Sequence, residues 1–437
     1  MTPRVTAWDR PLAAGRTLLS LHGADLVLIA VGLLTIFISF VHGELHGGDV
    51  PLYHRYAVAF WSGPNAFRTL PSEYPPLSLA AFSLTLLPAG GDYITVFAAW
   101  MAGFFLLGYW LFHRFEGRQA ATAYALYLLL GAAGTLLSRF DIVPVLLVVG
   151  AIWAARRGRF SIAHLLLALG VLFKLYPIVL VPILVLEQRH QLRAAGGEGG
   201  RRWLNRVVRS ACPALVLAAL AAVVTVLQWS TAASPLTYNA NRPIQVESLP
   251  ATALWLFSFL GYPVYAAQGW SSANLVGPLG SEVGGTFALL GLVGLAWIYK
   301  LFAQGRLEIA AAFLAAVAVI LSTSKVLSPQ FLIWLLPLAA MVDGVSRKWL
   351  LVSAITTVIY PVLYLEYDLL GLLFPVPYPA DFMLAILIRN AALGVATLTV
   401  LLRPLRTPLP SLAGVSAIAA VPGRRRVEPR TASPELE

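Results

Sequence analysis

The sequence contains few of the residues on which soluble proteins depend. Only 12% of its 437 residues are Asp, Glu, Lys or Arg, about half the share that is usual in soluble globular domains. It has a single cysteine, Cys212, which excludes an intramolecular disulfide and a cysteine-based metal cluster. No internal repeat is recognisable, so the sequence offers no support for a transporter built from duplicated halves.

Apolar residues are abundant instead. They make up 59% of the chain, and the mean hydropathy is +0.77. Apolar runs recur along the chain, and a run of about 20 residues crosses a bilayer as a helix. The first run, 24–42, follows a charged stretch and lacks a small-residue cleavage site, which indicates a retained span. We expect an all-α polytopic membrane protein with about twelve transmembrane segments.

The positive charge predicts orientation and not nucleic-acid binding. The net charge is +11, but most basic residues stand in short runs between apolar segments, where they set topology. The densest run covers residues 189–209 and includes Arg202, Arg206 and Arg209. Placing these runs in the cytoplasm predicts a multi-pass protein of the cell membrane with both termini inside. The bilayer is then an expected partner, and nucleic acid is not.

This orientation has consequences for four segments. Residues 43–92 must form a long first extracytoplasmic loop, in which 75–88 is too short to span and begins with two prolines. Residues 161–187 must enter and leave from one side as two short, broken helices, which are tolerated where they line a cavity. Residues 249–268 become an external or re-entrant segment.

Three regions follow from these assignments. Residues 1–23 form a cytoplasmic N-terminal segment, and 24–402 form the transmembrane domain. The remainder, 403–437, is rich in Pro, Arg and Ser, a composition typical of a disordered basic tail in the cytoplasm.

Polar side chains on the predicted extracytoplasmic side gather in a few short segments. Each could be an ordinary loop residue or a snorkelling side chain, but together they bring one exposed carboxylate and several cations and amides to one membrane face. Such a set suits a lipid-phosphate substrate, with cations on the phosphate and the carboxylate as base. The candidate site residues are Asp49, Tyr53, Glu73, Tyr74, Arg139, Asp141, Lys174, Tyr176, Arg242, Gln245, Glu247, Lys325 and Gln330.

Asp49 is the candidate that we weigh most heavily. It follows two glycines, which allow a tight backbone bend at the membrane surface. Nearby His42, His46 and His54 raise the alternative of a metal site, but their spacing fits no standard one, so no metal is expected. Lys174 lies at membrane depth, where a charge is costly and usually functional.

Four motifs resemble the multispanning GT-C glycosyltransferases, most closely glycosyltransferase family 87, which includes polyprenyl-phosphate-mannose-dependent mannosyltransferases. They occur in the family's order along the chain. The motifs are Gly48-Asp49 with Tyr74-Pro75-Pro76, Arg139-Phe140-Asp141, Lys174-Leu175-Tyr176-Pro177, and Lys325-Val326-Leu327-Ser328-Pro329-Gln330 with Phe331-Leu332-Ile333-Trp334.

The resemblance implies inverting transfer of a sugar, mannose by analogy, from a polyprenyl-phosphate donor to a glycolipid or glycan acceptor at the extracytoplasmic face. Asp49 matches the position of the family's catalytic base. Lys174, Arg242 and Lys325 are expected to contact the donor phosphate, while Arg139 and Asp141 would shape the pocket. No cofactor is implied, and the absence of a second acidic residue beside Asp141 argues against a metal.

Two alternatives from other classes remain. A lipid or solute transporter or flippase needs ionisable residues within the spans, where this sequence has only Lys174 and Arg389. A membrane acyltransferase would use a histidine base, for which His46 and His54 are available. Activity that survives replacement of Asp49 by Asn but is lost on replacement of a histidine would favour the acyltransferase.

Overall fold

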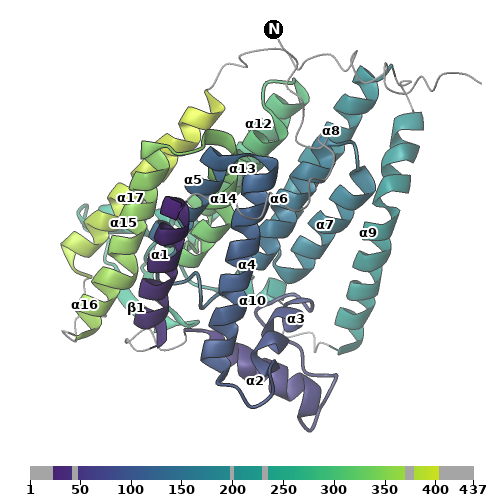
Figure 1. Ribbon diagram of the computed structural model, residues 1–437. Helices are drawn as coiled ribbons and strands as arrows, with labels where there is room; N and C mark the ends of the chain where they lie inside the picture. The colour runs from purple at the N-terminus through teal and green to yellow at the C-terminus, as the bar shows by residue number, and fades with distance from the viewer. Residues whose placement is uncertain (1–22, 42–47, 197–200, 229–234, 370–377, 403–437) are drawn as a thin grey trace, which may run out of the picture.

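The computed structural model describes residues 23–41, 48–196, 201–228, 235–369 and 378–402. The tail 403–437 and all but the last residue of the segment 1–23 lie outside the described residues. The described chain is mostly helical, as expected (Figure 1). Its α-helices are α1 (Gly23–Val41), α2 (Val50–Ser62), α3 (Ser78–Phe82), α4 (Tyr93–Phe115), α5 (Arg118–Gly131), α6 (Ile142–Arg156), α7 (Phe160–Phe173), α8 (Val181–Ala194), α9 (Arg201–Gln228), α10 (Pro235–Asn241), α11 (Leu249–Ser258), α12 (Gly280–Ala303), α13 (Ile309–Thr323), α14 (Leu332–Asp343), α15 (Arg347–Thr357), α16 (Tyr364–Leu369) and α17 (Ala380–Leu401).

The number of long spans differs from the expectation. In the described part of the chain, five helical segments are long and apolar enough to cross a membrane: α4, α9, α12, the segment Arg347–Glu366 and α17. The expectation of about twelve is therefore wrong. Other apolar runs form helices of 10–17 residues, among them α6, α7 and α13, which are shorter than the roughly 20 residues that a full crossing needs.

The break expected near Lys174 is present. Helix α7 ends at Phe173, and Lys174 has an extended backbone with φ −154° and ψ 137°. A 3-10 turn, η2 (Tyr176–Leu180), then leads into α8. Pro177 and Pro182 begin these two elements, where a proline lacks only an amide that would be unpaired in any case. The chain therefore interrupts its helix and presents Lys174 and Tyr176 from a bend.

The segment 75–88 also does not span, as expected. It contains only α3 and the 3-10 turn η1 (Ser83–Leu86). Two other short helical turns connect longer helices. The 3-10 turn η3 (Pro329–Phe331) precedes α14, and the π-helical turn η4 (Val358–Leu363) lies between α15 and α16.

A β-hairpin corrects the all-α expectation. Strands β1 (Tyr265–Gly269) and β2 (Ser272–Val276) pair antiparallel, with Gly269 opposite Ser272. The two-residue turn consists of Trp270 and Ser271, which both have positive φ, 58° and 52°. That is the pattern of a type I′ turn, which usually takes Asn-Gly, so this hairpin was hard to predict from the sequence.

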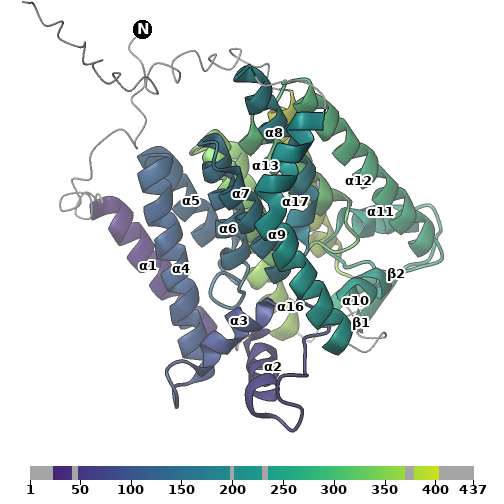
Figure 2. The same cartoon turned by 90° about the vertical axis from the view of Figure 1, so that its right-hand side faces the viewer.

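One end of the helical assembly carries the short elements. Figures 1 and 2 both place α2, α3, α10 and β1 toward the lower end, and the end of α8 at the opposite one. Apolar side chains on the outer helices face outward, for example Leu220 on α9 and Leu292 on α12, which are 61% and 67% exposed. Exposed apolar surface of this extent is what a lipid-facing helix requires.

Candidate functional site

A polar cavity of about 300 Å³ lies where several distant segments meet. Its walls come from the start of α2, the loop before α3, the turn before α6, the break after α7, the segment after α10, the hairpin turn and η3. The structure brings nine of the thirteen candidate residues together here. They are Asp49, Glu73, Tyr74, Arg139, Lys174, Tyr176, Arg242, Gln245 and Gln330.

Asp49 is held at the N-cap of α2, directly before its first residue, by its local sequence. Gly48 has φ +48°, a conformation that glycine adopts without strain, and Pro51 lies in the first turn of the helix. The Asp49 side chain accepts no capping hydrogen bond from α2. Instead, it forms an ion pair with Arg139, and the Tyr74 hydroxyl donates to its Oδ2 over 3.4 Å. The carboxylate thus points away from its own helix, toward the cavity wall.

The surroundings keep Asp49 ionised. Burial alone would raise the pKa of this carboxyl, but the charge and hydrogen bond of Arg139 and the charge of Lys174 outweigh it, so the net pKa is lowered. A neighbouring opposite charge within a few ångströms has this effect generally. Asp49 is therefore an unprotonated carboxylate at neutral pH.

Lys174 and Asp141 form a second ion pair behind the cavity wall. The Lys174 ammonium donates to Asp141 Oδ1 over 2.6 Å, and the Trp334 indole donates to the same oxygen. Asp141 is fully buried, and the lysine nitrogen also lies 4.8 Å from the centre of the Phe140 ring. Arg139 and Asp141 are therefore not paired with each other, since each binds a partner from another segment.

Several buried hydrogen-bonding atoms on the cavity wall have no hydrogen-bond partner in the described structure. Among them are the Tyr176 hydroxyl, Gln245 Oε1, Gln330 Oε1 and Arg242 Nε. An unpaired buried polar group costs free energy, which a ligand rich in hydroxyl groups would recover. The Tyr176 ring stacks on Trp334 with 4.2 Å between centres, which fixes the position of its hydroxyl.

A second, larger cavity adjoins the first. It has a volume of about 720 Å³, and Arg242 lines both. Its wall along α12 is mostly small or apolar, with Gly280, Gly284 and Gly285 facing it, while Lys325 stands with Arg242 on its polar side. Burial and the charge of Arg242 lower the pKa of Lys325. Two cations that repel each other in this way form an arrangement that an anion would stabilise.

Four candidate residues do not line the polar cavity. Tyr53 is fully buried and stacks on Phe82, so its place is in the packing behind Tyr74. Asp141 lies behind Lys174, as described above. Lys325 lines the larger cavity instead, and its ammonium donates to the Ala240 carbonyl over 2.6 Å.

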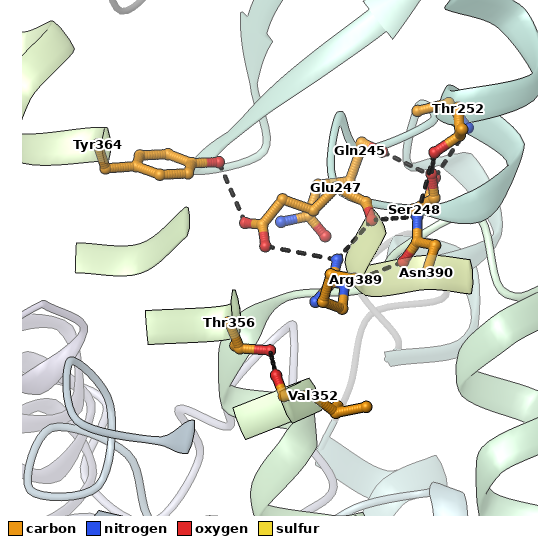
Figure 3. A network of polar contacts seen from close by, with 10 residues as sticks. Gln245, Glu247, Ser248, Thr252, Val352, Thr356, Tyr364, Arg389 and Asn390 are labelled. Atoms are coloured by element: carbon orange, nitrogen blue, oxygen red, sulfur yellow. Dashed lines mark hydrogen bonds and ion pairs between the residues drawn. The ribbon is translucent and has the colours of Figure 1, made fainter. Parts of the chain in front are cut away.

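Glu247, the fourth, belongs to a buried network with residues from the middle of α17 (Figure 3). Arg389 donates to the Glu247 carbonyl oxygen over 2.7 Å, and Asn390 donates to the same oxygen over 3.3 Å. The Glu247 carboxylate accepts from Tyr364 and lies 3.8 Å from the Arg389 guanidinium. Glu247 therefore does not line the polar cavity, and its contacts link the segment bearing Gln245 to α17.

Sequence reasoning missed several residues of the wall. Trp270, Ser271 and Ser272 reach the polar cavity from the hairpin turn, and the Ser272 hydroxyl accepts from Arg242 over 3.4 Å. No local pattern pointed to them, because the turn lacks glycine at its centre. Tyr238 also lines the cavity, and its position in an unusually polar stretch was a usable signal.

The histidines do not form a cluster in the described residues. His54 stacks on Tyr93 and lies 3.4 Å from Thr85, and His42 and His46 lie outside the described residues. No group of three or more His, Cys, Asp or Glu side chains suited to a metal occurs in the described part of the chain.

Comparison of the sequence with known protein families and with curated proteins finds no match.

Proposed function

We propose that this chain is a multi-pass membrane glycosyltransferase that transfers a sugar, with mannose as the expected one, from a polyprenyl-phosphate donor to a hydroxyl of a glycolipid or glycan. The observation that supports this most is that a polar cavity and a larger, mostly apolar cavity adjoin each other at Arg242. An ionised carboxylate, Asp49, faces a polar cavity with unpaired acceptors, and a cationic wall at Arg242 separates it from an apolar cavity.

In the proposed reaction, Asp49 removes a proton from the acceptor hydroxyl as the oxygen attacks the anomeric carbon. The bond from that carbon to the phosphate oxygen breaks, and the phosphate leaves with the electron pair. A single displacement of this kind inverts the configuration. The lowered pKa of Asp49 is compatible with its role, because the base receives the proton late, from a hydroxyl that is already losing it to the new bond.

The cations have separate roles in this proposal. Arg242, on the wall shared by the two cavities, and Lys325, on the polar side of the larger cavity, would bind the donor phosphate and stabilise the charge that grows on it. The apolar cavity along α12 would take the isoprenoid units next to the phosphate. Lys174 is held by Asp141 and the surrounding rings, so its contribution is the positive potential beside Asp49.

A transporter or flippase is the second candidate. It is favoured by the two buried ion pairs, Lys174 with Asp141 and Arg389 with Glu247, because buried charges within a membrane protein often mark translocation pathways. Against it, Asp49 and the unpaired acceptors form a set suited to bond-making at one end of the helices.

The test is sugar transfer by purified, reconstituted protein. A panel of radiolabelled polyprenyl-phosphate sugars is offered with crude lipid acceptors, with nucleotide sugars as the comparison. The proposal predicts that label moves from at least one lipid donor into a new product and from no nucleotide sugar. Movement of an intact labelled lipid across the bilayer, without a new product, would establish the flippase instead.

A further inference from the structure

A third cavity, of about 510 Å³, lies between the end of α8 and the start of α9. Three arginines line it, Arg202, Arg206 and Arg209, together with Trp203 and Asn205. None of its described lining residues is acidic. The helix ends that line it lie at the end of the molecule opposite α2 and α3 (Figures 1 and 2), so this cavity is separate from the site of Asp49.

The arginines form one charged face. Their spacing of four and three residues places them on the same side of a helix, one above another. All three are exposed, so a ligand can reach them. Arginine forms paired hydrogen bonds with phosphate through its planar guanidinium.

The walls of this cavity are held by contacts between the two helices. The Gln188 amide of α8 donates to the Ser210 hydroxyl of α9 over 3.0 Å. The Arg189 guanidinium lies over the Trp203 ring at 5.1 Å. These contacts hold α8 and α9 together without using Arg206 or Arg209.

The position of the arginines along α9 indicates the kind of anion. Beyond Arg209 the helix is apolar and outward-facing: Leu215, Leu220 and Val223 are each more than half exposed. The arginines therefore stand where an apolar span begins, at the level of lipid headgroups, and tryptophan is typical of that boundary. A ligand there would meet positive charge at one end and an apolar helix face at the other.

We infer that this cavity binds the headgroup phosphate of an anionic phospholipid, with the acyl chains lying along the exposed face of α9. The basic runs place this end of the molecule in the cytoplasmic leaflet, whose anionic lipids basic pockets between helices bind. The inference rests on the membrane placement within the proposed function and not on sugar transfer.

The test is native mass spectrometry of the full chain in detergent, titrated with phosphatidylglycerol or with phosphatidylcholine of the same acyl chains. Each cation near an anionic headgroup contributes roughly fivefold to binding, so the triple variant R202Q/R206Q/R209Q should bind phosphatidylglycerol roughly 100-fold more weakly. The matched control K300Q/R306Q/R347Q removes three cations outside the cavity and should bind as the unmodified protein does.

Several outcomes overturn the inference. These are equal binding of the two lipids, equal losses in the triple variant and the control, or full displacement of phosphatidylglycerol by millimolar inorganic phosphate, which would indicate a site for free anions. If the triple variant does not fold, the single variant R206Q provides the measurement, with an expected loss of roughly fivefold. Unchanged affinity in that variant would also contradict the inference. None of these results depends on glycosyltransferase activity.

Discussion

Replacing Arg139 by Gln should shift the pH dependence of sugar transfer to higher pH. Arg139 is the neighbour that most strongly lowers the pKa of Asp49, and burial acts in the opposite direction. With the arginine removed, burial prevails over the remaining neighbours, and the pKa of Asp49 rises. The base must be unprotonated to act, so activity at low pH is lost first.

The size of the effect follows from the contact. One opposite charge in direct contact lowers a carboxyl pKa by about 1–3 units, so the acid limb of the profile should move to higher pH by about that amount in R139Q. In the unmodified protein the limb should lie at a pH below the ordinary range of an aspartate, because its pKa is lowered.

The assay is kcat/KM for sugar transfer from pH 2 to 9, a range that includes the low acid limb of the unmodified protein and reports the ionisation of the free enzyme. R139K keeps the charge and should keep most of the profile. R242Q is the matched control, since Arg242 lines the same cavity but is bonded to Ser272; it should reduce activity without moving the acid limb. A uniform loss in R139Q at every pH, with the limb in place, would refute the reasoning.

Three further predictions concern donor binding and packing. R242Q should raise KM for the lipid donor about tenfold or more, because a hydrogen bond to a charged group is worth about 1.5–3 kcal/mol, and an unchanged KM would place the phosphate elsewhere. A Cβ at Gly285 would have no protein atom within 4 Å, so G285L places a side chain in the apolar cavity. This variant should reduce transfer from long-chain donors more than from short-chain analogues. The control G394L, on α17 and equally unobstructed at its Cβ, should not. E247Q leaves the buried Arg389 without its counter-charge and should destabilise the fold by about 3–5 kcal/mol, seen as a lower unfolding temperature, part of which E247Q/R389Q should recover.

The membrane-like, helical character of the chain could be predicted because it rests on composition and charge placement, which act along the whole sequence. The break at Lys174 could also be predicted. Pro177 disfavours a continuous helix, and the basic runs on both sides of 161–187 place both ends of this segment on one side of the membrane. The number of spans could not, because an apolar run such as that of α6 or α13 looks the same whether it crosses fully or ends after 15 residues.

Sequence reasoning named residues that line one cavity, but it did not predict which of them form ion pairs with each other. Nine candidates line one cavity, because a buried polar side chain costs free energy unless other polar groups lie beside it. Which cation meets which carboxylate depends on the packing of distant segments: Arg139 binds Asp49 and Lys174 binds Asp141, although Arg139 and Asp141 are neighbours in sequence. The contact of Glu247 with Arg389 depends on such packing too, since the two residues are 142 positions apart.

The central claim, that Asp49 is the base of a sugar transfer, is tested most directly by comparing D49N with E73Q in a single-turnover assay. Both residues are acids on the wall of the same cavity, and both changes remove a charge at nearly constant volume. Loss of a general base lowers the rate about 100- to 10,000-fold. We predict that loss for D49N, with donor binding and unfolding temperature retained, and a far smaller effect for E73Q. Equal rates in D49N and the unmodified protein would contradict the account.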